Sequence, residues 1–129
     1  MKIQKSSEDY LEMILMLQEK KGFARSVDIA SGLCVTKPSV SYATKRLREN
    51  GYITMDADGL ITLTECGREI ACRMYSRHKM LTDFLLSIGI DEETAREDAC
   101  RLEHDLSDKS FEALCRFSHW TQEKSGGKT

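Results

Sequence analysis

The stretch that decides the fold is SVDIASGLCVTKPSVSYATKRLRENGYITMDADGLITL, residues 26–63. Ser26 begins a short predicted helix, and the tight connection GLCV at 32–35 follows it. Thr36 then stands where an N-cap side chain accepts a hydrogen bond from the first turn of the next helix. Pro38 occupies that first turn, where a missing backbone N–H breaks no helical hydrogen bond. The pattern predicts two helices joined by a sharp turn.

A predicted β-hairpin follows the second of these helices. The β-forming residues at 52–55 and 60–63 flank the turn sequence DADG at 56–59. Upstream, apolar residues at helical spacing predict another helix that runs to Lys20 and stops before Gly22. Three helices with a sharp turn before the third, followed by a hairpin, are the order of a winged helix-turn-helix. In that motif the third helix enters the major groove of DNA.

The third predicted helix has an apolar face and a polar, basic face. Val40, Ala43 and Leu47 share the inner face at 100° per residue. The other face carries groups that can read bases or neutralise phosphates, namely Ser41, Tyr42, Lys45 and Arg46, with Ser39 at the flank. A basic helix face is usually only solvated, and the two serines could equally be first-turn caps. The whole order of helices and hairpin favours DNA binding.

Three further helices are predicted after the hairpin. The first covers about 64–87 and has Thr64 as its cap, and the second covers about 91–106. The last begins at Ser107 or Asp108. The inward residues predicted for the second of these helices are Ala95, Ala99, Leu102 and Leu106. Residues 123–129 are predicted to form a disordered tail.

The helix over 91–106 carries three types of metal ligand within five residues. Cys100, Glu103 and His104 have i, i+3, i+4 spacing, so they share one helix face beside the apolar stripe. That placement predicts a position at the edge of the core. Thiolate, carboxylate and imidazole are common ligands of divalent transition metals. Each residue alone has a structural interpretation, such as a small buried hydrophobe for Cys100, and only the cluster indicates a metal site.

Two other helices offer ligand types. Asp9 and Glu12 are spaced i, i+3 in the first helix, and His78 lies near the apolar flank of the long helix. Asp9 could instead serve the helix N-terminus, Glu12 could be a surface residue, and a lone histidine is more often packed than metal-bound. The remaining cysteines show no C-x-x-C pairing and are predicted to be structural: Cys34, Cys66, Cys72 and Cys115.

Composition limits the class of protein. The chain has 129 residues, 40% apolar and 31% charged, which is typical of a folded, water-soluble domain. It lacks an apolar run of about 20 residues for a membrane span, and its N-terminus lacks the apolar stretch of a secretory signal. We therefore expect a cytoplasmic protein with no membrane partner and reduced cysteines. The net charge of −2 divides into +3 over 1–80 and −5 over 81–129, which predicts two tasks.

Several of these residues together resemble a known family. The matching segments are SEDYLE at 7–12, VDIA at 27–30, PSVS at 38–41, GLITLT at 59–64, RH at 77–78 and CRLEH at 100–104. Over about residues 5–120 the chain resembles the iron- and manganese-dependent repressors, which are the diphtheria toxin repressor and manganese transport regulator proteins. The resemblance implies a mainly α fold. A winged helix-turn-helix DNA-binding domain would cover 1–64, and an all-helical dimerisation and metal-binding domain would cover 65–122.

The resemblance also implies a function. We expect a homodimeric, metal-activated repressor of manganese or iron homeostasis genes that binds a palindromic double-stranded DNA operator. We expect no enzymatic activity and no small-molecule substrate. The implied metal ligands are Asp9, Glu12, His78, Cys100, Glu103 and His104. The implied DNA contacts are Thr36, Pro38, Ser39, Ser41, Tyr42, Lys45 and Arg46. The predicted dimer contact uses Leu81, Phe84, Leu85 and Ile88, although these residues could instead close the core of the single chain.

The predicted site combines two branches of that family. Asp9, Glu12 and the short length resemble the manganese branch, which has a glutamate where this chain has Cys100. The iron branch has a cysteine there. It differs in having a methionine where this chain has Asp9, a histidine where this chain has Arg96, and a small C-terminal barrel domain. Oxygen ligands favour Mn²⁺, whereas a thiolate favours Fe²⁺, Co²⁺ or Zn²⁺. The expected cofactor is Mn²⁺ or Fe²⁺, with Co²⁺ or Zn²⁺ as surrogates.

Two other functions are weighed against this one. A metal-independent winged-helix regulator could sense an oxidant or a small molecule through a thiol such as Cys66 or Cys72. A zinc hydrolase could use Glu103 as general base, but the H-E-x-x-H motif of such enzymes is absent from the sequence. A chain of this length with a DNA-reading domain also leaves little room for a substrate pocket.

Overall fold

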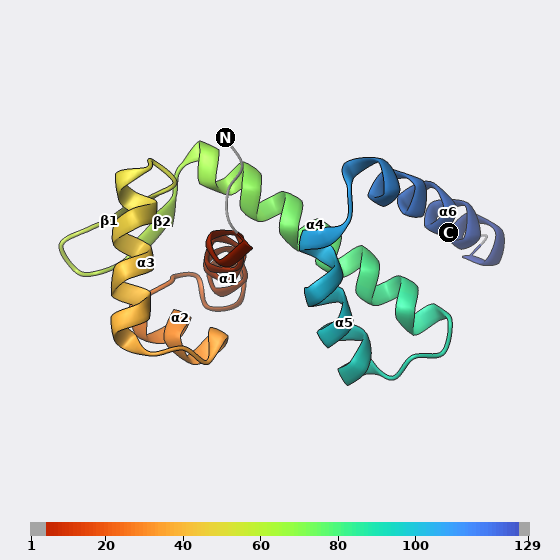
Figure 1. Cartoon of the computed structure of the whole chain (residues 1–129), viewed down its shortest axis with the longest axis horizontal. Helices are drawn as coiled ribbons and strands as arrows, with labels where there is room; N and C mark the ends of the chain where they lie inside the picture. The colour runs from red at the N-terminus through yellow and green to blue at the C-terminus, as the bar shows by residue number, and fades with distance from the viewer. Residues whose placement is uncertain (1–4, 127–129) are drawn as a thin grey trace. The chain divides into compact units, whose positions relative to one another are not determined.

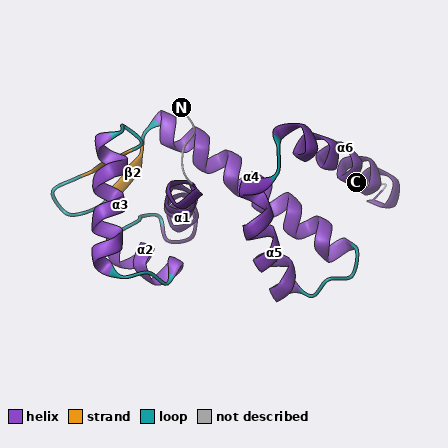
Figure 2. Cartoon of the chain, in the orientation of Figure 1, coloured by secondary structure: helices purple, strands orange, loops and turns teal. Residues whose placement is uncertain are grey.

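The computed structural model describes the backbone of residues 5–126 and the side chains of residues 5–118. The elements in order are α1 (Lys5–Lys21), α2 (Ser26–Leu33), α3 (Lys37–Glu49), β1 (Ile53–Met55), β2 (Ile61–Leu63), α4 (Glu65–Ser87), α5 (Glu92–Asp105) and α6 (Asp108–Gly126) (Figure 1). Helices dominate, and the two short strands pair as a hairpin (Figure 2). This order confirms the predicted fold class.

The chain forms two compact units that divide inside α4. The first unit ends at Tyr75 and the second begins at Ser76, whereas the predicted domain boundary lies between residues 64 and 65. Ala71, near the middle of α4, belongs to the core of the first unit. Leu81, further along the same helix, is 1% exposed and lies in the second unit. One helix of 23 residues therefore serves both units.

The core of the first unit is built around α1. This helix packs against α2, α3 and β2, and its Leu11 and Ile14 are fully buried. The apolar spacing that predicts the helix also selects its inner face, because residues three and four apart lie on one side. Other fully or nearly fully buried members of this core are Ile29, Val40, Ile53 and Ile61.

The turn between α2 and α3 is set by two cap residues. Cys34 adopts the left-handed conformation, with φ 57° and ψ 47°, and its N–H donates to the carbonyl of Ala30. Two residues later, the Thr36 hydroxyl oxygen accepts a hydrogen bond from the Ser39 N–H at 3.2 Å. Pro38 lies in the first turn of α3, as predicted. The sharp turn predicted before the third helix is therefore confirmed.

The hairpin between α3 and α4 has the register Ile53↔Leu63, Thr54↔Thr62 and Met55↔Ile61. At its tip, one carboxylate oxygen of Asp56 accepts the N–H groups of Asp58 and Leu60, each at 2.9 Å. These bonds close the turn locally, which confirms the turn predicted from DADG.

The start of α4 rests against the hairpin. The Thr64 hydroxyl accepts the Gly67 N–H at 3.2 Å and donates to the carbonyl of Gly51 at 2.7 Å, so this residue caps α4 as predicted. A Cβ atom on Gly67 would lie 2.0 Å from the carbonyl oxygen of Tyr52. Glycine is therefore required where the helix passes the chain that leads into β1.

The inner face of α5 differs from the predicted one. Ala95 and Ala99 are fully buried, but Leu102 is 38% exposed, so the prediction of Leu102 as a core residue is wrong. Glu103 takes the third inward position instead and is fully buried, although the sequence places it at the edge of the core. The row 95, 99, 103 repeats every four residues, which keeps these side chains on one line of the helix.

The last helix begins where the sequence predicts. The Ser107 hydroxyl accepts the Ser110 N–H at 3.1 Å, so Ser107 is the cap of α6. The helix runs to Gly126, so it extends over the first residues of the tail predicted from 123, and residues 127–129 lie outside the described part. Among the described helices, none combines the length and the apolar character that crossing a bilayer requires.

Candidate metal centre and DNA-reading helix

A buried carboxylate between two imidazoles is the main feature of the second unit. Glu103 of α5 is 0% exposed. Nδ1 of His78, on α4, lies at hydrogen-bond distance, 3.0 Å, from one of its carboxylate oxygens. Nε2 of His104 lies 3.4 Å from the other oxygen, and the His104 side chain is only 2% exposed. The three side chains form a largely buried polar cluster.

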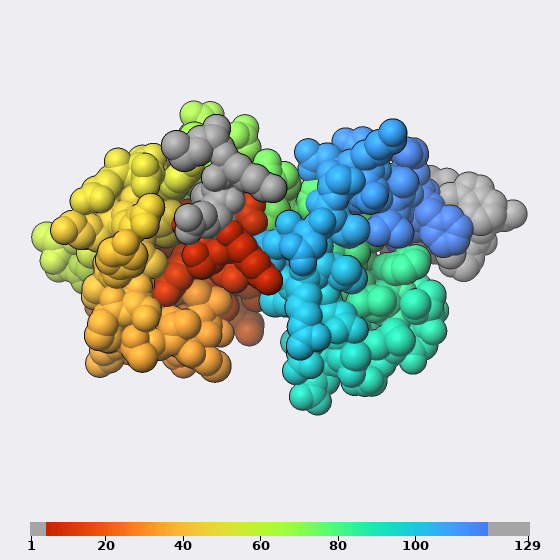
Figure 3. All heavy atoms as spheres, in the orientation of Figure 1, coloured from red at the N-terminus to blue at the C-terminus, as the bar shows by residue number. Residues whose placement is uncertain are grey.

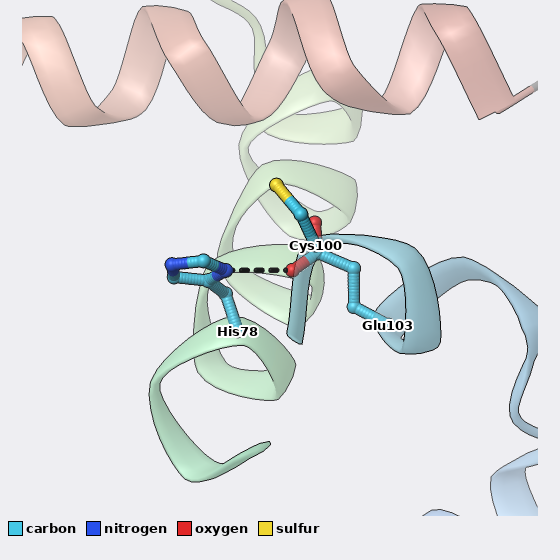
Figure 4. Close-up of side chains that lie close together, drawn as sticks. All are labelled: His78, Cys100 and Glu103. Carbon is cyan, nitrogen blue, oxygen red and sulfur yellow. Dashed lines mark hydrogen bonds and ion pairs between the residues drawn. The ribbon is translucent and has the colours of Figure 1, made fainter. Parts of the chain in front are cut away.

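Cys100 adds a thiol to this cluster. Its Sγ, a ring nitrogen of His78 and a carboxylate oxygen of Glu103 all lie within 4.8 Å of one another (Figure 4). Ligand atoms of a bound transition metal lie about 3–4 Å apart, given bond lengths of about 2.0–2.3 Å. Nitrogen, sulfur and oxygen donors at this spacing fit a divalent metal with a small inward movement of the side chains.

The structure therefore brings together several predicted ligands. His78, Cys100 and Glu103 converge from α4 and α5, although 22 to 25 residues separate the histidine from the other two. Asp9 and Glu12 lie on α1 in the first unit; Asp9 is half-buried and Glu12 is 6% exposed, so Glu12 is not an open surface residue. Burial of an acidic side chain is unusual and indicates a specific role.

Arg77 belongs to the RH segment at 77–78, but the sequence gives it no role of its own. It directly precedes His78 and is 4% exposed. An arginine in a long helix is usually solvated, and the residues that pair with it lie 26 to 31 positions away. The signal in the sequence is the RH segment that Arg77 shares with His78.

The outer face of α3 carries the predicted DNA contacts. Thr36, Pro38, Ser39, Ser41, Tyr42, Lys45 and Arg46 are all exposed, and α3, orange to yellow in Figure 3, contributes to the surface of its unit. Val40 and Leu47 face inward, at 0% and 3% exposure. Thr44 is also buried, where its hydroxyl donates to the Val40 carbonyl at 2.8 Å. A basic, hydroxyl-rich face stands away from the core.

Two side-chain pairs organise that face. The Thr36 hydroxyl donates to the Ser39 hydroxyl at 2.9 Å, and Thr36, not either serine, is the residue that caps the helix. Arg46 donates to the Tyr42 hydroxyl at 3.2 Å, and its guanidinium lies 5.7 Å from the centre of the Tyr42 ring. Tyr42 is 64% exposed, so the pair presents an aromatic ring and a positive charge together.

The predicted dimer residues have different surroundings. Leu81 is 1% exposed in the single chain, so its side chain is already buried without a partner. Phe84 packs edge-on against Phe117 of α6, with 6.4 Å between ring centres. Ile88 is 59% exposed and Phe117 is 56% exposed. Among the described residues of this unit, the exposed large apolar side chains lie at the end of α4, on α6 and, with Leu102, on α5.

The cysteines bear on the thiol-sensor alternative. Cys34, Cys66 and Cys72 are exposed, and none of the five cysteines in the chain forms a disulfide. Burial raises the pKa of the Cys115 thiol, despite the opposing charge of Arg77, so this thiol is protonated at neutral pH. A protonated thiol reacts slowly with oxidants because the thiolate is the nucleophile.

Comparison with known protein families assigns both units. Residues 2–59 match the N-terminal DNA-binding domain of the iron-dependent repressors, and residues 64–128 match their metal-binding and dimerisation domain. The chain belongs to the iron-dependent repressor family. It is thus a metal-dependent DNA-binding transcriptional regulator, and its two domains indicate a DNA operator and a homodimer.

Known relatives agree with this assignment. The transcriptional regulator MntR of Bacillus subtilis strain 168 is 37% identical over 95% of this chain and 87% of its own length. A manganese-dependent transcriptional repressor in complex with manganese has a TM-score of 0.80 and 28% identity, over 88% of this chain and 52% of that one. The manganese regulator SloR has a TM-score of 0.78 and 30% identity, and the match covers 93% of this chain and 55% of that one. The chain spans about half the length of these solved structures.

Membership of this family confirms the predicted resemblance and the metal-dependent regulatory function. It also supports a divalent metal cofactor, as the donor set of the second unit does. The alternative of a metal-independent thiol sensor is not favoured, because the second unit matches a metal-binding domain.

Proposed function

We propose that this chain represses manganese or iron homeostasis genes, acts in the cytoplasm and binds a palindromic DNA operator as a homodimer. Residues 1–64 would read DNA, residues 65–122 would hold the metal and the dimer partner, and the chain would catalyse no reaction. One observation carries the proposal. The buried carboxylate of Glu103 lies 3.0 Å from His78 and 3.4 Å from His104, with the Cys100 thiol within 4.8 Å of the first pair.

The proposed ligand set is Asp9, Glu12, His78, Cys100, Glu103 and His104. The last four belong to the second unit, and the first two are acidic residues of α1. Carboxylates gathered without a cation repel one another, and a divalent metal supplies the positive charge that removes this repulsion. A bound metal would therefore stabilise the arrangement in which these side chains are gathered.

This arrangement explains metal activation as a shift between conformations. A ligand favours a state only by its stronger binding to that state. If the complete ligand set exists only when the two DNA-reading units are correctly spaced, metal binding favours the form that fits two operator half-sites. A twofold dimer then matches the symmetry of a palindromic operator.

The choice of metal depends on Cys100. Carboxylate oxygens suit Mn²⁺, whereas a thiolate increases the affinity for Fe²⁺, Co²⁺ and Zn²⁺. The relatives with manganese in their names support Mn²⁺. The thiol close to His78 and Glu103 supports Fe²⁺. We propose that Cys100 is a ligand and that both metals activate the protein.

Operator binding measured during anaerobic titration with Mn²⁺, Fe²⁺, Co²⁺ or Zn²⁺ tests the proposal. We expect each activating metal to tighten operator binding and a chelator to reverse it. Glu103→Gln keeps the shape of the side chain but removes its charge, so it should weaken metal activation at least tenfold. The matched control Glu97→Gln alters an exposed glutamate of the same helix and should behave as wild type.

Two results would contradict the proposal. Equal operator affinity with and without chelator would exclude a metal switch. Activation by Mn²⁺ alone, with no effect of Fe²⁺ at any concentration, would place Cys100 outside the working site.

A further inference from the structure

Arg77 holds three elements of the second unit together. One of its terminal nitrogens, Nη1, donates to the main-chain carbonyl oxygens of Glu103 at 2.9 Å and Leu106 at 2.8 Å. The other, Nη2, pairs with the carboxylate of Asp108. The charged side chain is only 5% exposed. Burial of a guanidinium is unfavourable unless its donors are paired. The two terminal nitrogens of Arg77 are paired in this way, whereas its buried Nε has no hydrogen-bond partner among the described residues.

The contact with Glu103 satisfies the end of α5. The last four carbonyl groups of a helix have no partner within that helix. At the end of α5 the carbonyl of Leu102 accepts the N–H of Leu106 at 3.1 Å, and the carbonyl of Glu103 accepts from Arg77. A positive charge is also favourable at a helix C-terminus. Arg77 therefore caps the helical turn that carries Glu103 and His104.

The same side chain reaches the start of α6. Its partner Asp108 is the first residue of that helix. The Arg77 guanidinium also lies 4.8 Å from the centre of the ring of Phe111, one turn further along the helix. The Asp108 side chain is 82% exposed, whereas Arg77 is buried. The acidic side chain thus bends back over the buried arginine and holds the start of α6 beside α4.

We propose that Arg77 is a positioning residue that preforms the half of the metal site contained in the second unit. It holds the main chain of Glu103 and leaves the carboxylate to His78 and His104. His78 follows Arg77 directly, so one short segment of α4 supplies both a ligand and the group that orients another ligand. This inference rests on the proposed function, because it assumes that this cluster binds the metal.

The geometry requires arginine rather than any positive charge. Arg77 donates to three acceptors in a fixed planar arrangement, whereas a lysine ammonium is a compact charge on a flexible stem. Arg77→Lys should keep the charge in place but release the Glu103 carbonyl or Asp108. Loss of a residue that orients metal ligands typically weakens metal affinity about 10- to 100-fold.

The test uses the full-length dimer and Co²⁺ alone as the probe. Visible absorption of Co²⁺ reports both the affinity and the geometry of its ligands, and a thiolate ligand adds a charge-transfer band. We expect Arg77→Lys to weaken Co²⁺ binding about 10- to 100-fold and to change the shape of the visible bands. Circular dichroism and light scattering should be those of the wild type.

Arg96→Lys is the matched control. Arg96 lies on α5, is 65% exposed on its side chain and pairs with Glu92 within its own helix. This variant should bind Co²⁺ with wild-type affinity and spectrum. If Arg77→Lys does not fold, Asp108→Asn provides the second test. It removes the charge that faces Arg77, and it should weaken Co²⁺ binding by about three- to tenfold with altered bands.

The possible failures are distinguishable. If Co²⁺ binding to the wild type is absent or does not depend on Glu103, the proposed function fails and the inference fails with it. If the wild type binds Co²⁺ through Glu103 but a folded Arg77→Lys shows the same affinity and spectrum, only the positioning role is overturned. The same conclusion follows if Arg77→Lys is unfolded and Asp108→Asn binds as wild type.

Discussion

At the scale of single residues, Cys34 stands out because of its backbone. Among the described residues other than glycine, it alone has a positive φ, at 57°. The left-handed conformation is costly for a side chain with a Cβ atom, and glycine is preferred at this position after a helix. Its thiol makes only a weak contact with the Ser31 carbonyl, at 3.9 Å. The turn before the DNA-reading helix therefore contains local strain.

Replacement of this residue should relieve the strain. We expect Cys34→Gly to raise the free energy of unfolding by about 0.5–1 kcal/mol, because the strain exceeds the extra freedom of glycine in the unfolded chain. The measurement is urea unfolding followed by circular dichroism. Cys72→Gly is the control with the opposite sign, because Cys72 is exposed within α4 and glycine there should cost about 0.3 kcal/mol relative to cysteine. Destabilisation by both changes would contradict the assignment of strain to Cys34.

Glu103 shows how a residue-scale prediction can be partly right. Its spacing with Cys100 and His104 predicts a shared face, and the structure brings these side chains to one cluster. Its burial could not be predicted, because a helix with both Leu102 and Glu103 offers two candidate inner faces. The leucine is the more apolar candidate, yet the two alanines at 95 and 99 let α5 pack along the other line.

At the scale of elements, local capping signals predict the ends of the helices well. Thr36, Thr64 and Asp91 each accept a main-chain N–H from the first turn of the helix that follows. These bonds join residues three apart, so they depend on the local sequence and not on the rest of the fold. Gly22 likewise follows the end of α1 with φ 86°.

The cap of α5 should make stability depend on pH. The N–H of Thr94, and then its side-chain hydroxyl, hold the pKa of Asp91 below its usual value of 3.8. A carboxyl with a lowered pKa in the folded state contributes stability above its unfolded pKa, and this contribution is lost as the pH falls through the folded pKa. In the variant Asp91→Asn the side-chain amide can still cap α5, but it has no carboxyl group to titrate. The difference in melting temperature between wild type and variant should therefore be constant above about pH 5 and change below it. A constant difference at all pH values would contradict this.

The basic face of α3 leads to a prediction about salt. Lys45 is exposed on the side of the helix opposite to Val40 and Leu47. A lysine that contacts a phosphate releases about one counterion, so Lys45→Ala should reduce the slope of log affinity against log salt by about 0.9. Affinity should fall equally for operator and unrelated DNA, measured by fluorescence anisotropy. Lys109→Ala, at an exposed position on α6, is the control, and an equal effect of both changes would argue against α3 as the interface.

At the scale of the whole molecule, the division of charge between the two halves gains a physical meaning. The basic half contains the exposed face of α3, and the acidic half contains Glu103, whose charge a bound cation would cancel. The formal net charge of −2 describes the metal-free chain. Each bound divalent ion adds up to two positive charges before proton release, so the metal-bound form should be the better DNA binder.

The exposed apolar residues of the second unit lead to a prediction about assembly. Leu86, Ile88 and Phe117 are 40%, 59% and 56% exposed, so they are available for contact with a second subunit. We expect Ile88→Glu to weaken the dimer at least tenfold, because a charge would be buried without a partner. Light scattering over a concentration series measures this. Val27→Glu, at a residue 55% exposed in the first unit, should leave the dimer intact. A dimer unaffected by Ile88→Glu would place the interface elsewhere.

Sequence and tertiary structure determined different parts of this protein. The amino-acid sequence alone determined the helices, their caps, the hairpin and the types of metal ligand, because these depend on periodicity and on contacts within about four residues. The burial of Glu103, the burial of Leu81 and the contact of Arg77 with the end of α5 follow from the packing of the folded chain. These outcomes depend on which helix faces meet, and the pairs of residues involved lie more than 20 positions apart. Local sequence patterns carry no information about that choice, because it depends on packing between distant segments.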